Sequence, residues 1–144
     1  MSTGGHFSIA ELCASSTAER LEIVNAPPPD VLDNLQVAAS GMEQVRTLLG
    51  HPVRVDSGYR CPALNRAVNG APGSAHLRGY AVDFVCPGYG APRRIVEAIR
   101  DSGIPFDQLI CEGSWVHISF DPRLRRECLT AHFGAGGTTY TQGV

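Results

Sequence analysis

The chain has 144 residues, of which 43% are hydrophobic and 18% charged, so we expect residues 1–144 to form a single globular domain. The net charge of −2 gives no electrostatic basis for nucleic-acid binding. No apolar run is long enough to span a membrane, and the N-terminus has neither the basic region nor the apolar core of a signal peptide.

Two short helices are predicted near the N-terminus, at residues 7–12 and 15–21. Ser8 is placed to cap the first helix, and Glu11, three residues later, completes a capping box. The second helix begins with the same kind of pattern. The prolines at 27–29 then break the chain and connect these helices to the rest of the domain.

A long helix is predicted from about 31 to 49. Its apolar residues recur at nearly helical spacing, which indicates a face that packs against a sheet. Asp30 is the predicted N-terminal cap, and Gly50 is the predicted C-terminal cap. Residues 52–57 then alternate between apolar and polar side chains and are expected to form a strand.

The middle of the chain continues with a short helix that begins at Pro62, a residue suited to the first helical turn. Residues 69–73 are turn formers and predict a loop. The alternating run at 81–85 predicts a strand. A helix then begins near Pro92 and ends near Gly103.

Two further strands are predicted at 106–111 and 115–120. The link between them, at 112–114, is short enough to predict an antiparallel hairpin. The tail that follows Pro122 is rich in glycine and threonine, and we expect it to cover a sheet edge or to fray.

Three side chains in these elements could bind one metal ion. Asp83 and His117 each lie in a predicted strand, so both can face the same side of a sheet, and His76 lies on the loop that leads to the first of them. Two imidazoles, a carboxylate and a water are typical of a catalytic zinc site, although a histidine and an aspartate seven residues apart are common in any chain. The predicted fold is α+β: a small antiparallel sheet with helices packed on one face and the zinc site in a groove on the other.

Three motifs follow one another along the chain: Ser57-Gly58-Tyr59-Arg60, then Ser74-x-His76-x-x-Gly79-x-Ala81-x-Asp83, then Trp115-Val116-His117-Ile118-Ser119. In this order and spacing they resemble the signature of the zinc D-Ala-D-Ala carboxypeptidase family. That family includes phage endolysin L-alanyl-D-glutamate peptidases, and it belongs to a wider group with lysostaphin-type enzymes and the hedgehog signalling domain. The resemblance runs from about Phe7 to Phe120.

The resemblance implies that His76, Asp83 and His117 are the ligands of a zinc cofactor. It also implies a carboxypeptidase or endopeptidase that cleaves stem peptides or cross-bridges of peptidoglycan. Arg60 could be a surface residue, but the resemblance implies that it binds a substrate carboxylate through both arms of its guanidinium. Gln108 matches a residue that recurs in the family, and it could orient the site from the strand at 106–111.

Glu112 is the candidate catalytic base, because a zinc peptidase needs a carboxylate to take a proton from water and pass it to the leaving amine. Many family members place Glu or Asp three residues before the last histidine, where this chain has Ser114. The wider group often has a histidine two residues before it, where this chain has Trp115. Asp107 is a second candidate for the base, and Glu112 could instead be a solvated turn residue.

Two other residues of the motifs have alternative roles. Ser74 could hydrogen-bond a metal ligand or the substrate, or it could only stabilise the turn before His76. Trp115 could line the substrate cleft, or it could fill the core. We assign both to substrate binding as hypotheses.

The five cysteines are scattered without a C-x-x-C pair, which favours free thiols in a reducing compartment. We expect the protein to be a monomer. Because no export signal is visible, we expect it to stay in the cytoplasm until phage-like lysis releases it to the cell wall, or to be carried in a virion. The alternative to an enzyme is a zinc-stabilised binding module that has lost catalysis. Such a module would keep the three ligands but would not need Glu112.

Overall fold

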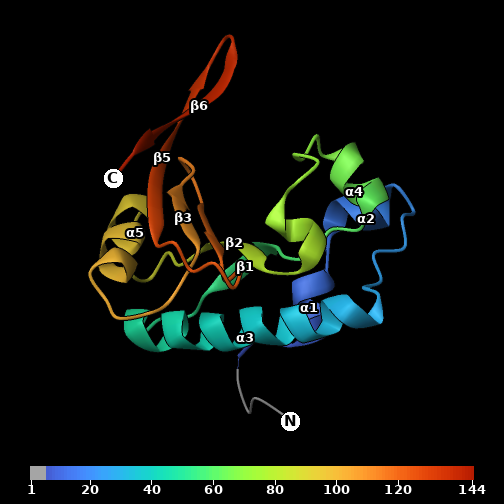
Figure 1. The fold of residues 1–144 in the computed structure, drawn as a ribbon, viewed down its shortest axis with the longest axis horizontal. Coiled ribbons are helices and arrows are strands. Elements are labelled where there is room, and N and C mark those ends of the chain that lie inside the picture. The colour runs from blue at the N-terminus through green and yellow to red at the C-terminus, as the bar shows by residue number, and fades with distance from the viewer. Residues whose placement is uncertain (1–5) are drawn as a thin grey trace.

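A six-stranded sheet with helices packed against one face makes up the fold, which confirms the predicted α+β class (Figure 1). The computed structural model describes residues 6–144. The strand order is β1-β2-β4-β3-β5-β6, and all neighbouring strands are antiparallel except β3 and β5. The strands are β1 (Arg54–Ser57), β2 (Ala81–Val85), β3 (Gln108–Cys111), β4 (Val116–Ser119), β5 (Glu127–Gly134) and β6 (Gly137–Gln142).

Along the chain, three helices precede the first strand, and the others lie between β1 and β3. No helix within residues 6–144 is both long and apolar enough to cross a membrane. The helices are α1 (Ile9–Cys13), α2 (Ser16–Arg20), α3 (Pro29–Leu49), α4 (Pro62–Ala67), the 3-10 helix η1 (Ala75–Arg78) and α5 (Pro92–Arg100).

The two short N-terminal helices are capped by serines, as the sequence predicts. The Ser8 hydroxyl accepts a hydrogen bond from the backbone N–H of Glu11 at 3.0 Å. The Ser15 hydroxyl accepts one from Ala18 at 3.1 Å. These bonds satisfy backbone donors that have no partner inside a helix.

The start of the long helix differs from the prediction, because Asp30 is not its cap. α3 begins at Pro29, with Pro28 at the cap position and Asp30 within the first turn. Proline suits the first helical position, since its fixed φ fits the helix and its missing N–H would have no partner there. Gly50 ends the helix as predicted, with a left-handed φ of 68°.

The core lies between the sheet and the inner faces of α3 and α5. Alternate residues of the central strands are buried in it, which leaves the residues between them on the opposite face of the sheet. Its main side chains are Val82, Phe84, Val116, Ile118, Leu35, Met42, Ile95 and Ile99.

The C-terminal tail extends the sheet, so the part of the prediction that it frays is wrong. β5 pairs with β3 in parallel, and β6 returns beside β5 as an antiparallel edge strand. The backbone N–H groups of Arg126 and Glu127 donate to the carbonyls of Phe106 and Asp107, at 3.0 and 2.9 Å. These bonds fix the point where the tail joins the sheet, and the sheet is therefore mixed and not wholly antiparallel.

Candidate metal centre

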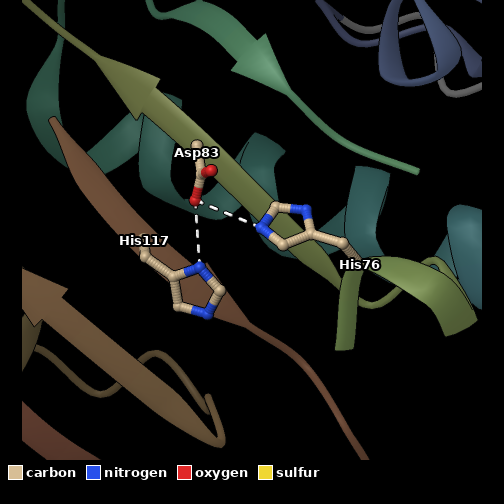
Figure 2. Close-up of side chains that lie close together, drawn as sticks. All are labelled: His76, Asp83 and His117. Carbon is tan, nitrogen blue, oxygen red and sulfur yellow. Dashed lines mark hydrogen bonds and ion pairs between the residues drawn. The ribbon is translucent and has the colours of Figure 1, made fainter. Parts of the chain in front are cut away.

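Asp83 and His117 lie side by side on the face of the sheet opposite α3 and α5. They are direct partners in the β2–β4 pairing, so their side chains share one face. His76 approaches them from η1, and the three side chains point toward one another (Figure 2). The Asp83 Oδ1 atom lies 2.9 Å from His117 Nδ1 and 3.3 Å from His76 Nε2. One ligand atom from each residue lies within 4.8 Å of the others.

The position of His76 is set by a helical turn where the sequence predicts a loop. The Ser74 hydroxyl caps η1 by accepting a hydrogen bond from the His76 backbone N–H at 3.2 Å. Gly79 ends the turn with a φ of 83°, a conformation that residues with a Cβ rarely adopt. Ser74 therefore stabilises the turn that carries His76, which is the alternative to its assignment to substrate binding; that assignment stays a prediction.

The orientation of the His76 ring is fixed from behind by Gly58. The His76 Nδ1 atom lies 2.7 Å from the Gly58 carbonyl oxygen and donates to it, which leaves Nε2 free to face Asp83. His76 is only 2% exposed, and this burial lowers its pKa. The ring is therefore neutral at pH 7, which is the form that binds a metal.

Gly58 itself is held by a close backbone contact with α1. A Cβ atom at this position would lie 2.1 Å from the carbonyl oxygen of Leu12, so only glycine fits. The same carbonyl accepts a hydrogen bond from the Tyr59 N–H at 2.7 Å. The glycine in the first motif thus lets a short N-terminal helix support the ring of His76.

Asp83 is a carboxylate at neutral pH. Burial alone would raise its pKa, but the neighbouring imidazoles hold the pKa well below its usual range, with His117 Nδ1 2.9 Å from the carboxylate. A partly buried carboxylate oxygen with an imidazole nitrogen on either side brings several metal-binding atoms together around a single point. This donor set and its convergence fit zinc, which takes imidazole nitrogen and carboxylate oxygen in a tetrahedral site.

The three residues lie in a groove of about 610 Å³ that also contains the other predicted site residues. Its lining residues include members of η1 and of the β5–β6 hairpin. The predicted residues that line it are Arg60, Ser74, Gln108, Glu112 and Trp115.

Arg60 reaches the groove from the chain that follows β1. Its Nε atom is buried and has no hydrogen-bond partner within residues 6–144. Its Nη2 atom lies 3.5 Å from the Ser74 hydroxyl. Asn25 braces this segment, since its side chain bonds the carbonyl of Tyr59 and the N–H of Cys61 at 2.9 and 2.8 Å. A held guanidinium with an unused donor is suited to bind a carboxylate.

Glu112 lies in the turn between β3 and β4 and lines the groove. Burial raises its pKa; nearby Asp83 adds to the rise, while His117 opposes it. A carboxylate with a raised pKa is a stronger base than an ordinary one. Asp107 is a poor alternative, because Arg125 holds both of its oxygens at 2.8 and 2.9 Å.

Trp115 and Gln108 take different positions in the groove. Trp115 lines it and packs against Phe133 of β5, with ring centroids 6.3 Å apart. Gln108 donates from its side chain to Glu127 at 2.7 Å and accepts nothing from the candidate ligands. It lies on the same face of the sheet as Asp83, but its side chain is hydrogen-bonded to Glu127 of β5.

Sequence reasoning missed two kinds of residue at this site. The carbonyl of Gly58 carries no side-chain signal, and its role depends on a contact across 18 residues. Phe133 and Tyr140 also line the groove, but they lie in a stretch that was expected to cover an edge or fray. The five cysteines are free thiols, and within residues 6–144 the only cluster of potential metal-ligating side chains is the His-Asp-His set.

An α+β domain with two histidines and an aspartate converging in a groove, beside an available carboxylate and arginine, has the features of a zinc hydrolase. The model of the Peptidase M15 family matches residues 5–119, which is most of the chain. The chain therefore belongs to the Peptidase M15 family, whose members are zinc-dependent metallopeptidases. No curated protein matches the chain.

Proposed function

We propose that this protein is a zinc peptidase that hydrolyses amide bonds in the stem peptides or cross-bridges of peptidoglycan. The observation that carries the proposal is the convergence of His76, Asp83 and His117 in one groove with Glu112 and Arg60. Family membership supports a peptide substrate. The proposal adds the identity of that peptide and the role of each residue.

His76, Asp83 and His117 are the residues that would hold zinc. Bound there, the ion supplies an acidified water and polarises the scissile carbonyl. The neutral ring of His76 and the ionised carboxylate of Asp83 are already in their metal-binding protonation states. Their support by Gly58 and by strand pairing holds the donors in place before substrate binds.

Glu112 accepts a proton from the attacking water and then donates it to the leaving amine. Its raised pKa suits both steps, because the same group must take and return a proton near neutral pH. Arg60 binds a carboxylate of the peptide with its unused guanidinium donors. This ion pair fixes the register of the peptide in the groove, so that one amide bond lies over the metal centre.

The test is mass spectrometry of soluble fragments released from purified cell walls. Zinc-loaded protein should release fragments with new amine ends, and the position of those ends names the bond. Chelated protein should release none, and zinc-loaded Glu112→Gln protein serves as the matched control for contaminating hydrolases. If zinc-loaded protein with one ion per chain releases nothing from several wall types, the proposed function is wrong.

A further inference from the structure

The β5–β6 hairpin lies outside the region that the Peptidase M15 model matches, which ends at residue 119. It nevertheless forms one side of the groove. Four of its side chains line the groove: Leu129, Phe133, Thr138 and Tyr140. The chain therefore brings its own C-terminal extension to the candidate metal centre.

Strand pairing places this extension on the metal-binding face of the sheet. Asp83 pairs with His117, His117 with Ile110, and Ile110 with Leu129, so one row of side chains crosses that face from β2 to β5. Side chains two positions apart along a strand share a face, so Phe133 points the same way as Leu129. Tyr140 joins them because it pairs with Ala131.

The two faces of the hairpin differ in chemistry. The face toward the groove carries Phe133 and Tyr140, which we call the aromatic wall. The opposite face is polar, and its His132 and Thr141 side chains hydrogen-bond each other at 2.8 Å. Phe133 and Tyr140 are 58% and 50% exposed, so they do not fill a core. Exposed aromatic side chains gathered at a groove are typical of a contact surface.

The aromatic wall stands beside the residues that we assign to catalysis. The Phe133 ring lies 3.1 Å from the position of a Cβ on Gly113, so it covers the turn that carries Glu112. Burial raises the pKa of the Tyr140 hydroxyl, and the carboxylates of Glu112 and Asp83 add to the rise. The hydroxyl is therefore protonated at neutral pH and can donate a hydrogen bond into the groove.

We propose that the aromatic wall binds the peptide substrate on the side of the metal centre opposite Arg60. Phe133 makes the apolar contact with a substrate side chain, and Tyr140 donates a hydrogen bond to a substrate backbone carbonyl. An extended peptide would then be fixed at two points, by its carboxylate at Arg60 and by its backbone at the wall. This inference rests on the proposed function, and it assigns the C-terminal extension as a specificity-determining part of the site.

The experiment compares three zinc-loaded variants with the wild-type chain on purified stem-peptide fragments. Phe133→Ala should raise KM about tenfold, as expected for a lost aromatic contact. Tyr140→Phe should lower kcat/KM about fivefold, the effect of one hydrogen bond. Thr139→Ala, on the polar face of the same hairpin, should change neither constant. Zinc content and melting temperature should stay at the wild-type values in all three, which excludes a structural cause.

The same variants give a second readout that does not need turnover. The single tryptophan, Trp115, packs against Phe133, so its fluorescence reports peptide binding at the wall. A synthetic stem pentapeptide should bind the zinc-loaded wild-type chain and bind Phe133→Ala about tenfold more weakly. Equal affinity, or no binding of the pentapeptide, overturns the aromatic wall. Binding that depends on Phe133 without release of amine ends supports the wall and contradicts the proposed hydrolysis.

Discussion

The two sides of the groove are built in different ways. On the metal side, His76 is 2% exposed and is held by Gly58, by η1 and by its neighbour Asp83. On the hairpin side, Phe133 and Tyr140 are half exposed or more and are held mainly by the pairing of β5 with β6.

This difference separates two requirements of a peptidase. Ligand geometry must be fixed before substrate arrives, and packing plus hydrogen bonds on rigid elements achieve that. Groups that contact the substrate can tolerate more motion. Exposed elements with few buried neighbours can therefore supply these contacts. The comparison leads us to expect that changes on the metal side abolish chemistry or stability, whereas changes toward the substrate side alter affinity.

The largest effect is expected from removing a candidate ligand. His117→Ala removes one of the three candidate ligands. Asp83 and His76 then remain as the only two, which are too few for a catalytic zinc site. We expect zinc content measured by plasma mass spectrometry to fall toward zero, and wall hydrolysis with it. His132→Ala is the matched control, because His132 lies on the polar face of the hairpin. Full zinc content in His117→Ala would remove this residue from the ligand set.

Replacing the candidate base should abolish turnover without loss of metal. Glu112→Gln keeps the shape of the side chain but cannot take a proton, so we expect kcat to fall roughly 10²–10⁴-fold. Zinc content should remain at the wild-type level. Unchanged kcat would leave Glu112 as a solvated turn residue.

The pH dependence of the wild-type enzyme gives an independent check on Glu112. The base works only when deprotonated, so activity should rise as pH increases through its pKa. Because burial raises that pKa, the acidic limb of kcat/KM should lie above the ordinary value of about 4.3 for glutamate. The limb should be absent from the residual activity of Glu112→Gln.

A change behind the metal centre should act through stability. Gly58→Ala would bring a Cβ to 2.1 Å from the Leu12 carbonyl, so the backbone must move. Such a clash destabilises a fold by about 1–3 kcal/mol. We expect a lower melting temperature together with weaker zinc affinity, because the Gly58 carbonyl also orients His76. Gly73→Ala is the matched control, since a Cβ there meets nothing within 4 Å. Equal effects of the two changes would contradict this account.

Arg60, which lies across the metal centre from the hairpin, should govern substrate affinity. Arg60→Lys keeps the positive charge but loses the two-armed geometry that matches a carboxylate. We expect KM to rise about tenfold with kcat nearly unchanged. Zinc content should not change. The control compares peptides with a free and with an amidated C-terminus. If Arg60→Lys raises KM equally for both, the C-terminal carboxylate is not the group that Arg60 binds.

The sequence predicted the metal side well, because its signals are local. Alternation placed Asp83 and His117 on one face of their strands, and the short link between β3 and β4 predicted their hairpin. The serine caps of α1 and α2 were equally visible. What joins these pieces into a site is the pairing of β2 with β4. The resemblance implied the shared ligand set, and periodicity alone could not have done so.

The hairpin side could not be predicted in the same way. Glycine and threonine in the tail are weak strand signals, and the parallel pairing of β5 with β3 depends on contacts across the chain. The aromatic residues Phe133 and Tyr140 gain their position only from that pairing. The sequence therefore indicated the chemistry of the groove but did not indicate that the β5–β6 hairpin lines one side of it.

The smallest effect is expected from the ion pair between Arg125 and Asp107, which ties the chain before β5 to the chain before β3. Arg125, just before β5, donates to both oxygens of the buried Asp107 carboxylate, at 2.8 and 2.9 Å. These bonds hold the pKa of Asp107 below its usual range, since they outweigh the effect of burial. A lowered carboxylate pKa contributes stability above the unfolded pKa of about 4, and that contribution is lost as pH falls.

We expect Arg125→Met to lower the melting temperature by a few degrees at pH 7, because Arg125 is partly exposed and solvent weakens the pair. The difference from wild type should shrink as pH falls below about 4, because Asp107 takes up a proton in the unfolded chain first and in the folded chain only at lower pH. Thermal scans from pH 3 to 8 measure it, with Arg93→Met on the exposed face of α5 as control. A difference that stays constant with pH would mean that Arg125 acts through packing and not through its charge. If Arg125→Met also raises KM as Phe133→Ala does, then the ion pair of Arg125 with Asp107 positions the aromatic wall as well as stabilising the fold.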